Sequence, residues 1–404
     1  MRGLIGLAVI TGGSGCLGPR ALEQTRLRYD QVVHETSDQQ WLRNLVRLRY
    51  GESPTFLDVA AVTSQFEVNG GATMTGGRER ASPNLSLFGN LSSQFRDAPT
   101  LSYVPRAQTE LTRAMLAPVG ITALGLMANT AWSYESVLRL IVSEANDLPN
   151  APGADRLIPE QVPLDSGFLE IARAAGRLRT SRIVALMPTD HTDVVSAPIS
   201  EDRVSASDLV AAADKKLEFK PSAKPANVVL TRTDPAYSLA IAPHALGDPD
   251  VLNLVQLLHL FPNRSQYGVK RVDRTTADPL QPLGDLNDQI SVKTRTILEM
   301  MIYLSKGVDV PDEHLCRGLA IQTPGPDGTL FDWTQVTSGL FHVCVQKKRP
   351  KEAAVAIEYR GYWYYIADSD HLSKATMTLI QAILNVQLSE PKQSGPILTL
   401  PVGL

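Results

Sequence analysis

The stretch that decides the fold class is AAVAIEYRGYWYYIA, residues 353–367, in the C-terminal third of the chain. Two apolar and aromatic runs, 353–359 and 362–367, flank Arg360-Gly361, and a glycine at this point fits a tight turn. We expect an antiparallel hairpin here, followed by a helix over 373–388 and a closing strand over 396–402. These elements predict a C-terminal layer that contains both sheet and helix.

Helices and short strands alternate along the rest of the chain. Apolar residues recur every three or four positions in the expected helices, which cover 21–50, 109–115, 121–127, 134–146, 167–178, 207–217, 249–260 and 290–305. Runs with a period of two predict strands over 182–187, 227–231, 237–242 and 340–346. We therefore expect an α+β fold of amphipathic helices with antiparallel hairpins, and not a parallel doubly wound sheet.

A long hairpin is expected over residues 55–104, which are rich in Gly, Ser, Thr and Asn. Asn69-Gly70-Gly71 has the composition of a turn, and Gly76-Gly77 with Pro83 marks the tip. Residues 85–92 alternate leucine with serine and asparagine, a pattern that suits lipid on one side and water on the other. A ring of copies could close such hairpins into a barrel, but we favour a hairpin folded onto its own globular domain.

Length and charge set the broad class of the protein. The chain has 404 residues and a formal net charge of -3, without the basic surplus of a nucleic-acid-binding protein. After residue 16, no apolar run reaches the roughly 18–20 residues that a membrane-spanning helix needs. We expect a signal segment at 1–16, a helical region with the long hairpin at 17–148, and an α+β domain at 149–404 with a loop excursion near 196–225.

The N-terminal sixteen residues have the order of a secretory signal. Arg2 is followed by an apolar run from Leu4 to Ile10 and then by small residues up to Cys16. Ending on a cysteine, the segment resembles a bacterial lipoprotein signal, in which Cys16 would carry the lipid and become the new N-terminus. Gly13 departs from that pattern, because such signals usually have Leu three residues before the cysteine. Leu17, rather than Asp, implies sorting to the outer membrane.

The same segment admits a second interpretation. Gly12, Gly15 and Gly18 are spaced as in the phosphate-binding turn of extended short-chain dehydrogenases, which would make the chain an NAD(P)-dependent oxidoreductase. The context disagrees, because Pro19 follows at once and no Tyr-x-x-x-Lys pair occurs in the chain. We favour the lipid anchor, with which we expect no cofactor.

Two pairs of residues have the types that bind metals. His314 and Cys316, like His342 and Cys344, stand two apart, so each pair would share one face of a strand. Four such ligands would suit tetrahedral zinc, and the two cysteines could instead form a disulfide. Because cysteine is among the residue types most often buried, we favour two buried free thiols and expect no metal.

Candidate catalytic residues are isolated. His191 and His371 each stand beside aspartates that could orient them as bases, but no Gly-x-Ser-x-Gly serine or cysteine nucleophile accompanies them. The residues from Asp368 to His371 precede an expected helix, where Asp and Ser serve as N-caps. We therefore favour a role without catalysis.

Three segments carry a resemblance to a known family. They are WLRNLVRLRY at 41–50, YESVLRL at 134–140, and YRGYWYYI at 359–366 with Asp368 and Ser373-Lys374. Together they resemble a family of uncharacterised bacterial lipoproteins, over about residue 29 to the C-terminus. The resemblance implies export and lipidation, and it brings no known activity.

These observations lead to one expected function. The chain is expected to be a lipid-anchored protein of the outer membrane, on its periplasmic or surface face, with a structural or assembly role. Its expected partners are the membrane, through the N-terminal lipid, and either further copies of itself in a ring or other envelope proteins. We expect no nucleic-acid partner.

Overall fold

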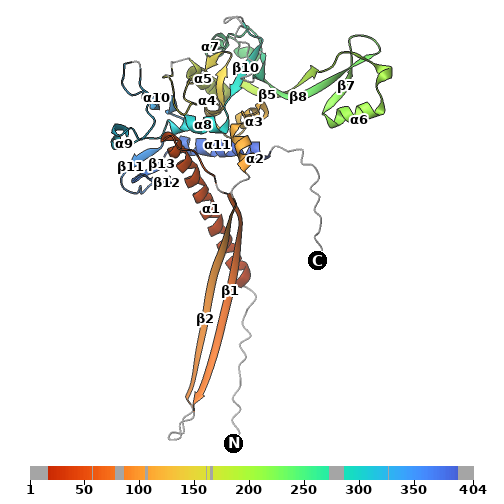
Figure 1. Ribbon diagram of the computed structural model, residues 1–404. Helices are drawn as coiled ribbons and strands as arrows, with labels where there is room; N and C mark the ends of the chain where they lie inside the picture. Colours follow the sequence, from red (N-terminus) through yellow and green to blue (C-terminus); the bar gives the residue numbers. More distant parts are fainter. Residues whose placement is uncertain are drawn as a thin grey trace. The chain divides into compact units, whose positions relative to one another are not determined.

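The computed structural model describes residues 17–56, 58–77, 86–104, 108–160, 162–163, 167–272, 286–325 and 327–389 (Figure 1). They form an α+β fold, as expected. The chain divides into two compact units, one with the residues up to Trp41 and Thr55–Gln108, the other with Leu42–Pro54 and the residues from Thr109 onward. The expected signal segment at 1–16 and the closing strand at 396–402 lie outside the described residues.

The first unit contains a long antiparallel hairpin. Strand β1 (Asp58–Gly77) pairs with β2 (Ser86–Val104) from Asp58↔Val104 to Gly77↔Ser86, with one irregularity between Val59 and Ala61. The expected turn at Asn69–Gly71 is wrong, because these residues pair with Ser92–Gln94 in the middle of the ladder. Glycine adopts extended backbone as readily as a turn, and the partner strand satisfies its backbone groups. Helix α1 (Leu17–Arg49) begins in this unit and ends in the second.

The second unit is built on a mixed, mainly antiparallel sheet. Its main path runs β4-β3-β10-β9-β8-β5, and β6 and β7 also pair with β8. Among the described strands of this sheet, only β9 and β10 run parallel. The strands are β3 (Val142–Ala145), β4 (Leu148–Pro149), β5 (Val184–Val194), β6 (Ile199–Ser200), β7 (Leu217–Pro221), β8 (Asn227–Ile241), β9 (Gln266–Arg271) and β10 (Gln289–Thr294).

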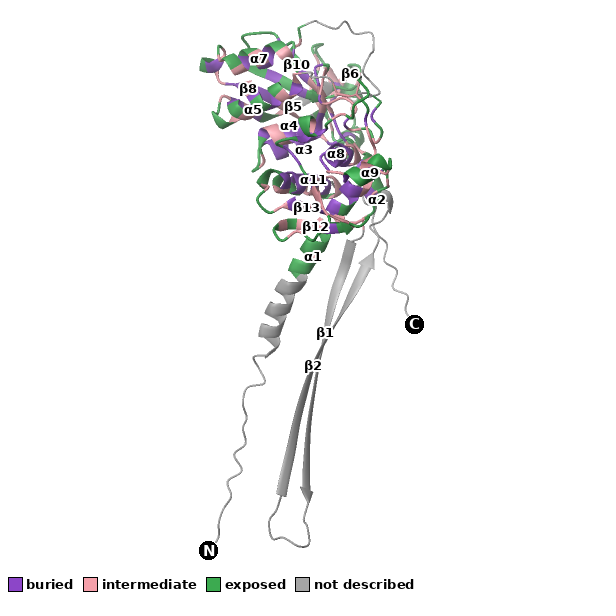
Figure 2. Ribbon diagram, turned by 90° about the vertical axis from the view of Figure 1, so that its left-hand side faces the viewer, coloured by how far each residue is buried: buried purple, intermediate pink, exposed green. Residues whose placement is uncertain are grey.

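Helices pack against this sheet and against one another. Contacts join α4 to α5, α5 to α7, and α3 to both α4 and β8, and buried residues run through α3, α4 and α8 (Figure 2). The helices are α2 (Gln108–Leu116), α3 (Ile121–Ala128), α4 (Tyr134–Ile141), α5 (Phe168–Thr180), α6 (Ala206–Asp214), α7 (Pro249–Leu257), α8 (Ile297–Ser305), α9 (Asp312–Cys316), α10 (Thr334–Thr337) and α11 (His371–Ser389), with 3-10 turns η1 (Glu201–Arg203) and η2 (Pro243–Ala245). No helix in the described ranges has the length and apolar character to cross a membrane.

The expected C-terminal hairpin and the helix after it are confirmed. Strand β12 (Ala353–Tyr359) pairs with β13 (Tyr362–Ala367), and β11 (Cys344–Gln346) adds a third strand to give the order β11-β13-β12. Arg360 and Gly361 both have positive φ, 50° and 80°, as a two-residue hairpin turn of the primed type requires. Helix α11 follows at once.

Four expected elements, two helices and two strands, differ from the elements observed. The helix expected over 290–305 is strand β10 followed by helix α8, and the helix expected over 134–146 is α4 followed by β3. The two strands expected over 227–231 and 237–242 are one continuous strand, β8. A short apolar run fits a buried strand and a buried helix equally well, so its periodicity alone does not separate them.

The expected boundary at residue 148 does not coincide with the division between the units. Strand β3 lies before it and pairs with β10, far along the chain, so both belong to one sheet. The excursion near 196–225 is mostly exposed, but it is an ordered part of the sheet and not a loop. Its strands β6 and β7 both pair with β8, and α6 lies between them in sequence.

Candidate functional site

A short stretch of paired backbone brings together residues that are more than thirty positions apart. After α8, the segment 307–309 runs parallel to the segment that leads into β11, with an isolated bridge between Val308 and Val343. The Asp309 N–H donates to the Val343 carbonyl (2.9 Å), and the Val343 N–H donates to the Gly307 carbonyl (2.9 Å). A Cβ atom on residue 307 would lie 2.5 Å from the Phe341 carbonyl oxygen, so this close approach requires Gly307.

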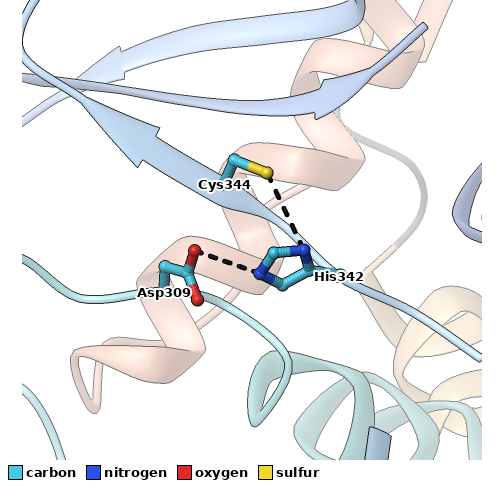
Figure 3. Close-up of side chains that lie close together, drawn as sticks. All are labelled: Asp309, His342 and Cys344. Atoms are coloured by element: carbon cyan, nitrogen blue, oxygen red, sulfur yellow. Dashed lines mark hydrogen bonds and ion pairs between the residues drawn. The ribbon is translucent and has the colours of Figure 1, made fainter. Parts of the chain in front are cut away.

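The alternation of the extended backbone decides which side chains meet. Val343 is completely buried and Val308 nearly so, which turns the residues on either side of Val343 to the opposite face. His342 and Cys344 therefore share a face with Asp309 beside them (Figure 3). The expectation that His342 and Cys344 lie on one face is confirmed.

Asp309, His342 and Cys344 form one cluster, which we call the DHC cluster. His342 Nε2 lies 3.0 Å from Asp309 Oδ2, and His342 Nδ1 lies 3.7 Å from Cys344 Sγ (Figure 3). One potential ligand atom from each residue lies within 4.8 Å of the other two. The imidazole thus stands between a carboxylate and a thiol, and the side chains of His342 and Asp309 are 46% and 41% exposed.

The N-terminus of α11 holds the histidine backbone in place. The His342 N–H donates to Ser373 Oγ (2.8 Å), and the Ser373 hydroxyl donates to Asp370 Oδ2 (2.6 Å). Asp370 also accepts the backbone N–H of Ser373 (3.0 Å), which is the geometry of an N-cap. The expected N-cap before this helix is confirmed, and His371, proposed above as a candidate base, is the first residue of the helix.

The carboxylates of Asp309 and Asp370 act on the other residues of the DHC cluster, while the Arg49 guanidinium acts on Asp309. The hydrogen bond to Asp309 raises the pKa of His342 above its ordinary value, because the carboxylate favours the imidazolium. Burial, together with the carboxylates of Asp309 and Asp370, raises the pKa of the Cys344 thiol. A site that disfavours the thiolate and favours the imidazolium is one that attracts positive charge.

His314 and Cys316, the other expected pair, are not part of this cluster. They lie on α9 and not on a strand, so their spacing does not place them on one face. His314 is buried, and its Nδ1 lies 2.6 Å from the Tyr50 hydroxyl, which also contacts the Tyr364 hydroxyl (2.6 Å). Burial lowers the pKa of His314, as expected for a neutral imidazole that packs among tyrosines.

The four-ligand set that the sequence offered as an alternative is therefore not assembled within the described part of the chain. Both cysteines are free thiols, with Cys316 exposed and Cys344 partly buried. The burial expected for both holds in part for Cys344 and fails for Cys316. Of the earlier candidates, Cys16, Gly12 and Gly15 lie outside the described residues, Gly18 lies in the first turn of α1, and His191 lies on β5.

Asp309 is the residue that sequence reasoning missed. It stands 33 positions before His342, in a short loop between two helices, and no spacing rule connects the two. The sequence Gly307-Val308-Asp309 is the one local signal for this residue. A glycine followed by a valine is typical of an extended segment that packs closely against another, and the aspartate comes next.

The β1–β2 hairpin carries a second functional pattern. Ten consecutive register pairs, from Val68↔Phe95 to Gly77↔Ser86, contain no ionisable residue. Within them the register places mainly apolar residues and glycine at positions of one face and mainly polar residues at positions of the other. The first face has Val68, Gly70, Ala72, Met74 and Gly76 with Phe95, Ser93, Leu91, Gly89 and Leu87, and the second has Asn69, Gly71, Thr73, Thr75 and Gly77 with Gln94, Ser92, Asn90, Phe88 and Ser86.

Comparisons with protein-family models, with curated proteins and with solved structures find no match to this chain.

Proposed function

We propose that this protein is a lipid-anchored protein of the bacterial outer membrane that assembles with copies of itself by inserting the β1–β2 hairpin into the bilayer. The observation that carries the proposal is the uncharged stretch of ten register pairs in that hairpin. The lipid on Cys16 would hold each copy at the membrane, and the hairpins of neighbouring copies would pair edge to edge. The role is structural, in building an envelope assembly.

The length of the uncharged stretch fits a bilayer. Ten residues in a strand rise about 33 Å, and a tilt of about 40° reduces this to about 25 Å along the membrane normal. This equals the height of the apolar band on outer-membrane barrels, whose strands need about 9–11 residues to cross. Charged residues bound the stretch, with Glu67↔Arg96 paired on one side and Arg78, Glu79 and Arg80 following β1 in the sequence.

The division between the two faces supports the same conclusion. In a membrane barrel, positions that meet lipid alternate with positions that meet the water-filled interior. The hairpin shows this alternation on both strands, and the register brings the apolar positions of both strands onto one face. This coincidence between two strands favours insertion over the alternative expected from the sequence, in which the hairpin folds onto its own domain.

A single inserted hairpin leaves the outer edges of both strands without partners. In lipid each unpaired backbone group costs several kcal/mol, so strands cross a membrane only in closed barrels. The smallest barrels have about eight strands, which sets a minimum of about four copies of a two-stranded arm. The proposal thus requires a ring of copies.

A deletion tests the arm. Removing residues 70–91 leaves Ser92-Ser93 as a two-residue loop between Asn69 and Gln94, which are already a register pair, so the rest of the hairpin can close. We expect the variant to lose the large detergent-extracted oligomer and to run as a monomer with an unchanged melting temperature for the second unit. An unchanged oligomer, or unfolding of the second unit, contradicts the proposal.

A separate variant tests the anchor. Cys16→Ser removes the only residue proposed to carry lipid and leaves the hairpin intact. We expect mass spectrometry to show an acylated Cys16 in the unaltered protein, and the variant to move from the membrane fraction to the soluble periplasmic fraction before assembly. An N-terminus without lipid in the unaltered protein contradicts the lipid anchor. Insertion of the hairpin is then tested by the deletion variant alone.

A further inference from the structure

We propose that the DHC cluster, Asp309, His342 and Cys344, is a binding site for one Zn²⁺ ion with an open coordination position for water. The site lies in the second unit, whereas the hairpin lies in the first. The inference is therefore independent of the proposed function, and the two fail separately.

The donor atoms match the ligand preferences of zinc. The DHC cluster offers one thiol sulfur, one imidazole nitrogen and one carboxylate oxygen, which are the three protein donor types that zinc takes. The mixture of sulfur with nitrogen and oxygen is typical of zinc and poorly suited to Mg²⁺ or Ca²⁺, which take oxygen ligands. Three protein ligands and one open position describe the zinc sites in which a water completes the tetrahedron.

The distances are close to those of a tetrahedral site. Zinc bonds of about 2.0–2.3 Å place neighbouring ligand atoms about 3.3–3.8 Å apart. The Cys344 Sγ–His342 Nδ1 distance is 3.7 Å, and all three donors lie within 4.8 Å of one another. Asp309 now faces His342 Nε2 at 3.0 Å, on the opposite side of the ring from Cys344, so its half-exposed carboxylate must rotate away from that nitrogen to share one ion with Nδ1 and Sγ.

The backbone beneath the DHC cluster is fixed before any ion arrives. The Val308–Val343 bridge fixes Asp309 beside His342 and Cys344, and Ser373 fixes the His342 N–H. Only side-chain torsions are left to adjust, which lowers the entropic cost of binding. Because the His342 and Asp309 side chains are partly exposed, an ion from solvent can reach them.

The charges around the DHC cluster bear on its occupancy. The Asp309 carboxylate stands beside the imidazole and the thiol, and a divalent cation would replace the thiol proton and offset the carboxylate charge. Arg49 donates its guanidinium hydrogen bonds to the carbonyls of Val308 and Ile321, although its charge also acts on Asp309.

Cobalt spectroscopy tests the site directly. The full-length protein, without a polyhistidine tag, is titrated with Co²⁺ and then with Zn²⁺. We expect one equivalent of Co²⁺ to produce a thiolate-to-cobalt charge-transfer band in the near ultraviolet, and Zn²⁺ to displace it. Cys344→Ser is expected to abolish this band, whereas Cys316→Ser, which removes the exposed free thiol on α9, is expected to retain it.

The other two ligands are tested by affinity. His342→Ala and Asp309→Asn are each expected to weaken zinc binding by at least about tenfold, with little change in the melting temperature of the metal-free protein. A charge-transfer band that fails to form in the folded protein, or that depends on Cys316, overturns the proposal. It is also overturned if metal-free Cys344 reacts with iodoacetamide faster than Cys316, because Cys344 would then be an activated nucleophile.

Discussion

At the scale of single residues, a buried arginine joins the helix α4 to the sheet. Arg295 is completely buried, and its guanidinium donates to the carbonyls of Arg139 (2.9 Å), Val142 (3.0 Å) and Asn150 (2.6 Å). It also lies over the Tyr303 ring, 4.6 Å from the ring centroid. The last carbonyls of a helix have no partners within the helix, and here the Arg295 guanidinium and the Asn150 side-chain amide donate to them where α4 becomes β3.

Replacing this guanidinium is expected to be strongly destabilising. Arg295→Met removes one donor from each of these carbonyls and breaks the ion pair with Asp155, although Asn150 Nδ2 still donates to the carbonyls of Arg139 and Val142. We expect the free energy of unfolding in urea to fall by about 3–5 kcal/mol. The control is Arg177→Met, which removes an exposed arginine that binds both carboxylate oxygens of Asp250. We expect a much smaller change there, because solvent screens an exposed pair. Equal losses in the two variants would show that Arg295 has no special structural role.

A buried lysine makes stability depend on pH. Lys306 is 4% exposed, donates to the Leu157 carbonyl (3.1 Å), and lies over the Trp333 ring. Burial disfavours its charged form and lowers its pKa to about 7, from 10.5 in the unfolded chain. Between these two values the unfolded state binds more protons than the native state, so the free energy of unfolding rises with pH.

The Lys306→Met variant isolates this contribution. The penalty for burying the ammonium is fully present below about pH 7 and disappears toward pH 10.5, and at the full shift it amounts to about 5 kcal/mol. Unfolding curves at several pH values are expected to show the variant as the more stable protein at pH 6, with the difference shrinking as the pH rises to 9. A difference that is constant with pH would contradict the lowered pKa.

At the scale of elements, the sequence predicts regular structure well where turn chemistry marks its ends. The hairpin around Arg360-Gly361 is one such case, because its turn residues have positive φ and an apolar or aromatic run stands on each side of them. The stretch 290–305 is the opposite case, because it is apolar throughout and strand becomes helix within it. Thr296 and Glu299 are the sequence signal for the start of the helix, because their side chains and backbone N–H groups form a capping box at the start of α8.

This capping box makes a measurable contribution to stability. Thr296→Ala removes the oxygen that accepts the Glu299 N–H (3.1 Å), and we expect a loss of about 1 kcal/mol in the free energy of unfolding. Thr378→Ala makes the same chemical change on an exposed face of α11, where alanine is the better helix former, and it should not destabilise the protein. A neutral Thr296→Ala would mean that tertiary packing alone starts α8.

The DHC cluster shows a similar limit for site prediction. The spacing of His342 and Cys344 predicts that they share a face, because alternation along extended backbone is a local rule. Asp309 joins them through a backbone bridge between distant segments, which depends on tertiary packing. His314 and Cys316 are also two residues apart, but they lie on a helix, where this spacing places two side chains on different faces.

At the scale of the whole molecule, the two compact units contain different proposed sites. The second unit has the mixed sheet, the C-terminal layer and the DHC cluster, and the first has the hairpin with ten uncharged register pairs. The sequence predicts the hairpin from alternation and glycine content. Only the register shows that the apolar positions of both strands belong to the same face of the hairpin. A shift of one residue would move the apolar positions of one strand to the opposite face.

In the proposed assembly, one face of the hairpin meets lipid and the other meets water. Adjacent positions on β2 test it, since Leu91 and Asn90 belong to opposite faces. A cysteine is placed at 90 or 91 with Cys316 and Cys344 replaced by serine, so that it is the single free thiol when Cys16 carries the lipid. It is labelled with a small fluorophore after assembly in lipid vesicles. We expect a lipid-attached nitroxide to quench the label at 91 more than the label at 90, and aqueous iodide to give the reverse order. Equal quenching at the two positions, or a label at 91 that neither quencher reaches, would contradict it.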